Sequence, residues 1–183
     1  MGRMDIPLNE SGEKQVLLLR ETMRMLPLDA VYSSPQLRAK ETAEAVAAGH
    51  KMPVQVTEAL AEVDFPAWVG KGWDELQIDP VYQMYHLSPA TARHEAFEAI
   101  TDVQKRTSSF LEELVRAHPG ARIALVSHAD PLRTILSHLL NFPLSEFRRF
   151  RISNASLSVL EGPPRWGLKL FNYRSDLQLN SDV

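Results

Sequence analysis

The chain has 183 residues and a formal net charge of −3, which suit one globular domain and give no overall attraction to nucleic acid or to an anionic membrane. It contains no cysteine, so disulfides, thiolate catalysis and cysteine-type zinc sites are excluded. The sequence has no apolar run of 18 residues and no signal-peptide pattern, and we therefore expect a cytoplasmic protein without a membrane span. The densest basic stretch, residues 147–151, is interpreted as a solvated helix face and not as a nucleic-acid patch.

The first predicted elements alternate between helix and strand. Residues 12–26 carry apolar side chains at helical spacing, which predicts an amphipathic helix. Residues 29–33 predict a short buried strand. Residues 35–48 predict a helix with Ser34 at its N-cap and a proline in its first turn. Residues 53–57 then alternate in polarity, as a strand does.

Residues 58–96 interrupt this alternation. They mix tryptophan and tyrosine with proline, glycine and acidic residues, which predicts an inserted region of loops and short helices that forms a lid or a pocket wall. The elements predicted after it are a helix at 97–118, a strand at 121–127, a helix at 131–140, a short helix at 143–150 and strands at 155–160 and 166–172. This order predicts an α/β fold, a three-layer sandwich with a largely parallel central sheet, in a single domain over residues 1–183.

Two polar clusters follow predicted strands. Ser33, Ser34 and then Arg38 stand at the carboxyl end of one strand, and Ser127 and His128 stand at the carboxyl end of another. Ligands of parallel sheets bind beyond the carboxyl ends of the strands, so we expect these clusters to share a site. A positive charge near the start of a helix interacts unfavourably with the helix dipole. A bound anion would offset this cost, so the position of Arg38 favours an anion site. No glycine-rich nucleotide loop and no Gly-x-Ser-x-Gly elbow occurs in the sequence.

Each candidate has a plainer interpretation when it is taken alone. Arg38 is then a surface arginine paired with Glu41 or Glu44. His128 is then a structural histidine at a strand end, and Glu62 is one of many acidic residues. The five other histidines lack the spacing of metal ligands, so we expect no metal site.

Five stretches match one set of family motifs in order and spacing. They are GRMDIPLNESG at 2–12, VYSSPQLRAKETAEA at 31–45, LAEVDFPAWVGKGWDEL at 60–76, IALVSHADPLRTIL at 123–136 and RISNASLSVL at 151–160. Together they resemble the histidine phosphatase superfamily, in its phosphoglycerate mutase-like branch, over nearly the whole chain.

The resemblance implies a fold like that of phosphoglycerate mutase and a phosphohistidine mechanism without metal or cofactor. It implies that His128, as the second histidine, and Arg38, as the second arginine, clamp the phosphoryl oxygens. It implies that Glu62 protonates the leaving oxygen. The residues expected from the same motifs to contact substrate are Arg3, Ser34, Ala129 and Asp130.

One family motif is absent from the chain. Family members open with an apolar strand in the middle of the sheet, followed by Arg-His-Gly, which supplies the nucleophile and the first arginine. The 183 residues contain no Arg-His-Gly. We therefore expect a truncated record of a phosphomonoester hydrolase for a small phosphorylated metabolite, inactive as it stands. A non-catalytic relative that binds phosphate ligands or a partner, a phosphoglycerate mutase-type phosphomutase, and a homodimer all stay open.

Overall fold

The strands form two separate sheets in the computed structural model, which describes residues 2–175. Strand β1 (Ala30–Ser33) lies between β2 (Val54–Val56) and β3 (Ile123–Val126), and all three are parallel. Strands β4 (Leu157–Glu161) and β5 (Gly167–Tyr173) form an antiparallel pair of their own. The strands predicted from the sequence are therefore present, and the one central sheet that they were expected to share is divided in two.

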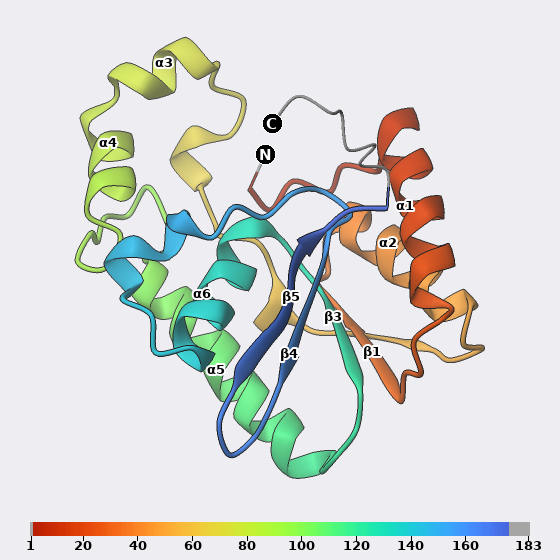
Figure 1. Ribbon diagram of the computed structural model, residues 1–183. Coiled ribbons are helices and arrows are strands. Elements are labelled where there is room, and N and C mark those ends of the chain that lie inside the picture. Colours follow the sequence, from red (N-terminus) through yellow and green to blue (C-terminus); the bar gives the residue numbers. More distant parts are fainter. Residues whose placement is uncertain (1, 176–183) are drawn as a thin grey trace, which may run out of the picture.

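Helices cover both faces of the parallel strands (Figure 1). Helices α1 (Glu10–Met23) and α2 (Leu37–Ala48) lie on one side, and α5 (Ile100–Ala117) and α6 (Ala129–Leu139) lie on the other. This is the predicted three-layer arrangement. It follows from strands that are apolar on both faces, because each face must be covered by helices.

Successive side chains of the parallel strands enter two different cores. Val31 of β1 and Ala124 of β3 pack toward α1 and α2. Tyr32 and Leu125, the next residues along, pack toward α5 and α6. This is the two-residue period of a strand, and it fixes which side chains each helical layer covers.

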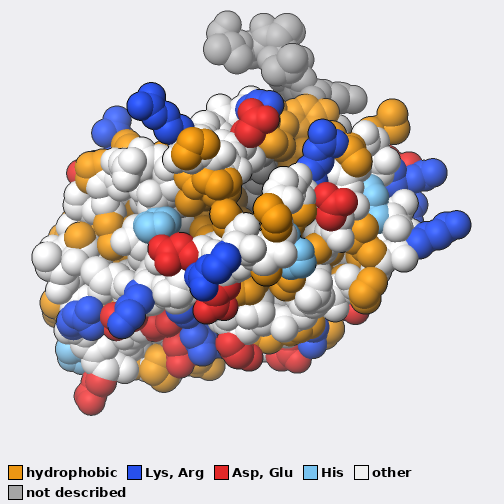
Figure 2. All heavy atoms as spheres, turned by 90° about the horizontal axis from the view of Figure 1, so that it is seen from below, with side chains coloured by type: hydrophobic (Ala, Val, Ile, Leu, Met, Phe, Trp, Pro, Cys, Tyr) orange, Lys and Arg blue, Asp and Glu red, His pale blue; other side chains and the backbone are white. Residues whose placement is uncertain are grey.

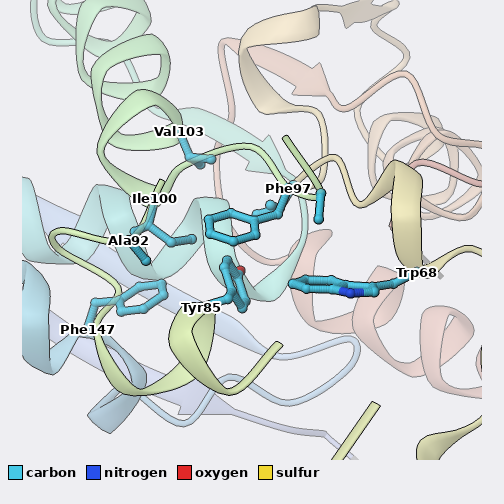
Figure 3. Packing of buried hydrophobic residues seen from close by; sticks show 9 residues of the cluster. Trp68, Tyr85, Ala92, Phe97, Ile100, Val103 and Phe147 are labelled. Atoms are coloured by element: carbon cyan, nitrogen blue, oxygen red, sulfur yellow. The ribbon is translucent and has the colours of Figure 1, made fainter. Parts of the chain in front are cut away.

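The inserted region forms a third core of its own. It contains the 3-10 helices η1 (Glu58–Leu60) and η2 (Pro66–Trp68) and the helices α3 (Trp73–Ile78) and α4 (Pro80–Leu87). Figure 3 shows Trp68 beside Tyr85 of α4 and Phe97 of the loop that follows, and aliphatic side chains of α5 belong to the same cluster. Trp68 is 6% exposed, so it packs this core and does not line an open pocket. The role of this region as a lid stays a prediction.

The predicted start of helix α2 is wrong. The helix begins at Leu37, with Gln36 at the N-cap and no hydrogen bond from the Gln36 side chain to the helix. Ser34 lies too early to cap it, and its buried hydroxyl is bonded to the side chains of Gln36 and His128 instead. The Ser34-Pro35 pair therefore resembles the start of a helix in sequence, but Ser34 serves the hydrogen bonds to Gln36 and His128 and not a helix cap.

Residues 147–151 are not simply a solvated helix face. They include the end of a 3-10 helix, η3 (Leu144–Arg149), in which Phe147 is fully buried. The guanidinium carbon of Arg148 lies 4.6 Å from the ring centroid of Tyr85 and 4.6 Å from that of Phe147. Arginine packs its flat face on aromatic rings, and here that contact fastens η3 to the inserted region.

The surface carries mixed charge. On the face shown in Figure 2, acidic and basic side chains are interspersed with each other and with hydrophobic groups. Among residues 2–175, no helix has both the length and the apolar character needed to cross a bilayer.

Candidate active site

The candidate site lies at the carboxyl ends of β1 and β3. Ser33 is paired in register with Val126, so the residues that follow the two strands emerge side by side. Ser34 comes next after β1, and His128 occupies the N-cap of α6. The Ser34 hydroxyl oxygen lies 2.7 Å from Nε2 of His128. The two polar clusters therefore meet, as the strand order predicted.

Gln36 organises this pair, although no pattern in the sequence singled it out. Its side-chain oxygen accepts a hydrogen bond from the Ser34 hydroxyl at 2.6 Å and another from the backbone N–H of Glu62 at 3.0 Å. The same oxygen lies 3.1 Å from Nε2 of His128. An amide oxygen only accepts, and the Ser34 proton is already donated, so Nε2 of His128 carries the hydrogen. Nδ1 of His128 then presents its lone pair to the site.

Glu62 faces that lone pair. Its Oε2 lies 3.9 Å from Nδ1 of His128, which is too long for a hydrogen bond. Burial raises the pKa of the Glu62 carboxyl to about 7, and the negative charge of Asp130 adds to this, although the Val63 N–H and nearby arginines oppose it. A carboxyl group that holds its proton near neutral pH is suited to general acid catalysis.

His128 is held neutral. Burial lowers the pKa of its imidazole to about 3, and the positive charges of Arg38 and Arg106 act in the same direction. Between about pH 3 and about pH 7, Glu62 is mainly protonated and His128 is mainly neutral, so their contact is not an ion pair.

Arg38 bonds to backbone carbonyls and to neither Glu41 nor Glu44. Its Nη1 donates to the Met4 oxygen and its Nη2 to the Gly2 oxygen, both at 2.9 Å. Burial lowers the pKa of Arg38, and the negative charges of Glu62 and Asp5 oppose that shift. Because these hydrogen bonds go to neutral carbonyls and not to a carboxylate, the positive charge of Arg38 is available to an anion.

Arg3 lies behind Glu62 and supports its backbone. The Arg3 Nε donates to the Glu62 carbonyl at 2.9 Å, and Nη2 forms an ion pair with Glu98 at 3.1 Å. Arg106 pairs with the same Glu98 at 2.8 Å. The expected substrate contact of Arg3 stays a prediction, since these bonds direct the side chain toward Glu98.

Comparison with known proteins identifies the family. The family model described as histidine phosphatase superfamily (branch 1) matches residues 1–173. The chain belongs to the histidine phosphatase superfamily. It is 31% identical over 161 residues to phosphoserine phosphatase 1 of Hydrogenobacter thermophilus, covering 87% of this chain and 76% of that protein.

Solved structures agree with this assignment to the histidine phosphatase superfamily. YhfR of Bacillus stearothermophilus matches with a TM-score of 0.86 and 28% identity, covering 93% of this chain and 86% of that one. A mycobacterial glucosyl-3-phosphoglycerate phosphatase in complex with VO3 matches with a TM-score of 0.85 and 26% identity, covering 94% and 89% of the two chains. The predicted α/β fold with a parallel central sheet is confirmed.

The remaining predicted contact residues lie at the start of α6. Ala129 opens the helix, where backbone N–H groups and the helix dipole favour an anion. Asp130 accepts hydrogen bonds from the Tyr85 hydroxyl at 2.6 Å and from Arg133 at 2.7 Å. Tyr85, which the sequence did not single out, thereby ties the inserted region to the candidate site.

Metal binding has no support in the described part of the chain. Residues 2–175 contain no group of three or more histidine, cysteine or acidic side chains placed to hold a metal ion.

Proposed function

We propose that this chain forms the phosphate-binding and proton-donating part of a histidine-type phosphomonoester hydrolase that acts on a small phosphorylated metabolite. His128 and Arg38 hold the phosphoryl oxygens, and Glu62 gives its proton to the oxygen of the leaving alcohol. The observation that carries the proposal is the buried Glu62 carboxyl, with a pKa of about 7, 3.9 Å from Nδ1 of His128. An alkoxide leaving group needs a proton at neutral pH, and such an acid supplies one.

The names of the relatives support the substrate class. Phosphoserine and glucosyl-3-phosphoglycerate, in the names of two of them, are both small phosphorylated compounds. Trp68 and the other buried aromatic residues of the inserted region pack with one another. The loops of this region are therefore left to contact the alcohol portion of the substrate.

Phosphate binding is expected to take up a proton. Nε2–H of His128 is engaged by Ser34 and Gln36, so only the lone pair of Nδ1 is directed to the site. A lone pair repels a phosphate oxygen, whereas an imidazolium N–H donates to it. A bound dianion raises the pKa of a neighbouring histidine, and His128 therefore becomes protonated when the anion arrives.

The family's nucleophilic histidine belongs to an Arg-His-Gly motif. The 183 residues contain no Arg-His-Gly. We expect no hydrolysis of a generic aryl phosphate by the chain alone. Hydrolysis by the purified chain that His128→Ala abolishes would contradict this expectation.

Calorimetric titration with inorganic phosphate and with vanadate tests the proposed pocket. We expect saturable binding that strengthens as the pH falls, with proton uptake that appears as a dependence of the heat on the buffer. Arg38→Ala should weaken binding at least about tenfold, as expected for a lost charge-assisted hydrogen bond. Arg93→Ala is the matched control, because Arg93 is 64% exposed and pairs with Asp102 away from the site. Equal affinity in both variants, with thermal unfolding showing both folded, would refute the proposed pocket.

A further inference from the structure

Helix α1 carries apolar side chains on its outer face as well as on its inner face. Val16, Leu19 and Met23 are buried and hold the helix to the fold. Leu17 and Leu18, which stand between them in the sequence, are 51% and 44% exposed. Within residues 2–175, neither leucine belongs to one of the three cores. Figure 1 shows α1 at the outer edge of the fold, with α2 on its inner side.

The exposed apolar surface extends to the end of the helix. Met25, just beyond the last turn, is 83% exposed. Single exposed leucines are common on protein surfaces. Two adjacent leucines at the centre of an outer helix face, with a methionine further along, form a continuous surface that a second partner can bury.

The two ends of α1 carry opposite charge. Residues 10–14 contain two glutamates and one lysine, so the first turn is negative overall. At the other end, Arg20 and Arg24 share one carboxylate, that of Glu21, at 3.1 and 3.0 Å, so that end is positive overall. An antiparallel copy of the helix would bring each negative end against a positive end. A parallel copy would bring like charges together.

The helix sequence is also self-complementary about its centre. A two-fold axis makes the same surface of both copies meet, and it sets the two helices antiparallel. With that axis between Leu17 and Leu18, each of these leucines meets the other leucine of the second copy. Lys14 of one copy then meets Glu21 of the other. The apolar side chains lie at the centre of this contact and the charged side chains lie around it, as in specific protein interfaces.

We propose that α1 is the interface of a homodimer, in which two copies of this helix pack antiparallel about a two-fold axis between Leu17 and Leu18. The helix has 14 residues and is about 21 Å long, so the contact does not exceed the small end of specific interfaces, about 1,200 Å². A dimer of that size is weak, with a dissociation constant on the order of 10 to 100 µM. This inference does not depend on the proposed function, because the candidate site lies at the carboxyl ends of β1 and β3.

Sedimentation equilibrium of the full chain tests the dimer. We expect monomer at about 1 µM and mainly dimer at about 500 µM. Leu18→Lys should weaken dimerisation at least about tenfold, because it places a charge without a partner at the centre of the contact. Val56→Lys on β2 is the matched control, since Val56 is also aliphatic and is 53% exposed. It should leave the dissociation constant unchanged.

Charge reversal tests the antiparallel arrangement. Glu10→Lys makes the first turn of α1 positive, and Arg24→Glu makes the other end negative. Each variant alone should dimerise about three- to tenfold more weakly, because like charges then meet at both ends of the contact. An equimolar mixture of the two variants should recover the native affinity, since every positive end again meets a negative one. Glu112→Lys, at an exposed position on α5, is the control and should dimerise as the native chain does.

Thermal unfolding shows whether each variant is folded, and four results would then overturn the proposal. A native chain that stays monomeric up to about 500 µM would mean that no second copy binds this face, including the case in which the same chain covers it. Equal dimerisation by Leu18→Lys would place the interface elsewhere. Dissociation caused by Val56→Lys would place it at β2. A mixture of the two charge-reversal variants that associates no better than either alone would exclude the antiparallel pairing.

Discussion

Replacing Glu62 by glutamine should change how stability depends on pH. In the native chain, burial raises the pKa of Glu62 from 4.5 to about 7. Between these two pH values, the folded chain holds a proton on Glu62 that the unfolded chain has released. The contribution of Glu62 to the free energy of unfolding is therefore fully present below pH 4.5 and is lost as the pH rises to about 7.

The magnitude follows from the size of this pKa shift. Each unit of pKa difference is worth about 1.4 kcal/mol, so the native chain loses about 3 kcal/mol through Glu62 across this range. His128 acts in the opposite direction, because burial lowers its pKa from 6.5 to about 3 and its contribution grows as the pH rises to 6.5. In the native chain, the pH dependences that Glu62 and His128 give to the free energy of unfolding offset each other. In Glu62→Gln, the contribution of His128 is no longer offset.

Urea unfolding followed by tryptophan fluorescence measures this effect. The free energy of unfolding of Glu62→Gln, relative to the native chain, should rise by about 3 kcal/mol between pH 4.5 and about 7. Taking the difference between the two proteins cancels the other titrating groups. Glu112→Gln, at an exposed position on α5, is the control and should follow the native curve. A difference between Glu62→Gln and the native chain that is constant with pH would refute the buried, protonated state of Glu62.

Three further substitutions test the packing around the site. Gln36→Leu removes an oxygen shared by three neighbouring groups and should cost about 2 to 3 kcal/mol of unfolding free energy. The ¹⁵N chemical shifts of His128 should then show a mixture of its two neutral tautomers. An unchanged Nε2–H tautomer would contradict the role given to Gln36. Trp68→Ala should cost about 3 to 5 kcal/mol in urea unfolding, and a cost below about 1 kcal/mol would mean that this core is loosely packed. Tyr85→Phe removes the hydroxyl bonded to Asp130 and should cost about 1 to 2 kcal/mol; no loss would show that this bond contributes nothing net.

The sequence predicted that His128 and Ser34 would lie close together. His128 and Ser34 meet because each follows an apolar strand, and parallel strands bring such residues to one edge. Apolar strands and their order along the chain can both be identified from the sequence pattern, so this meeting could be predicted.

Other features depend on side-chain geometry that no pattern encodes. Gln36 matters because its rotamer points its oxygen at Ser34 and His128, and Arg38 is held by the carbonyls of Gly2 and Met4. The N-cap expected at Ser34 failed for the same reason, since a buried hydroxyl bonds to the nearest strong acceptor. The division of the strands into two sheets follows from pairing between distant segments, which local propensity does not determine.

Within residues 2–175, no strand pairs with the edge of β3 that faces away from β1, and this has a consequence for handling the protein at high concentration. Natural proteins protect strand edges with charges, prolines or bulges, and IALV contains neither charge nor proline. A short, uncharged, apolar edge is a template for aggregation between molecules. Aggregation should therefore increase steeply with protein concentration, and a lysine placed on β3 would be expected to reduce it.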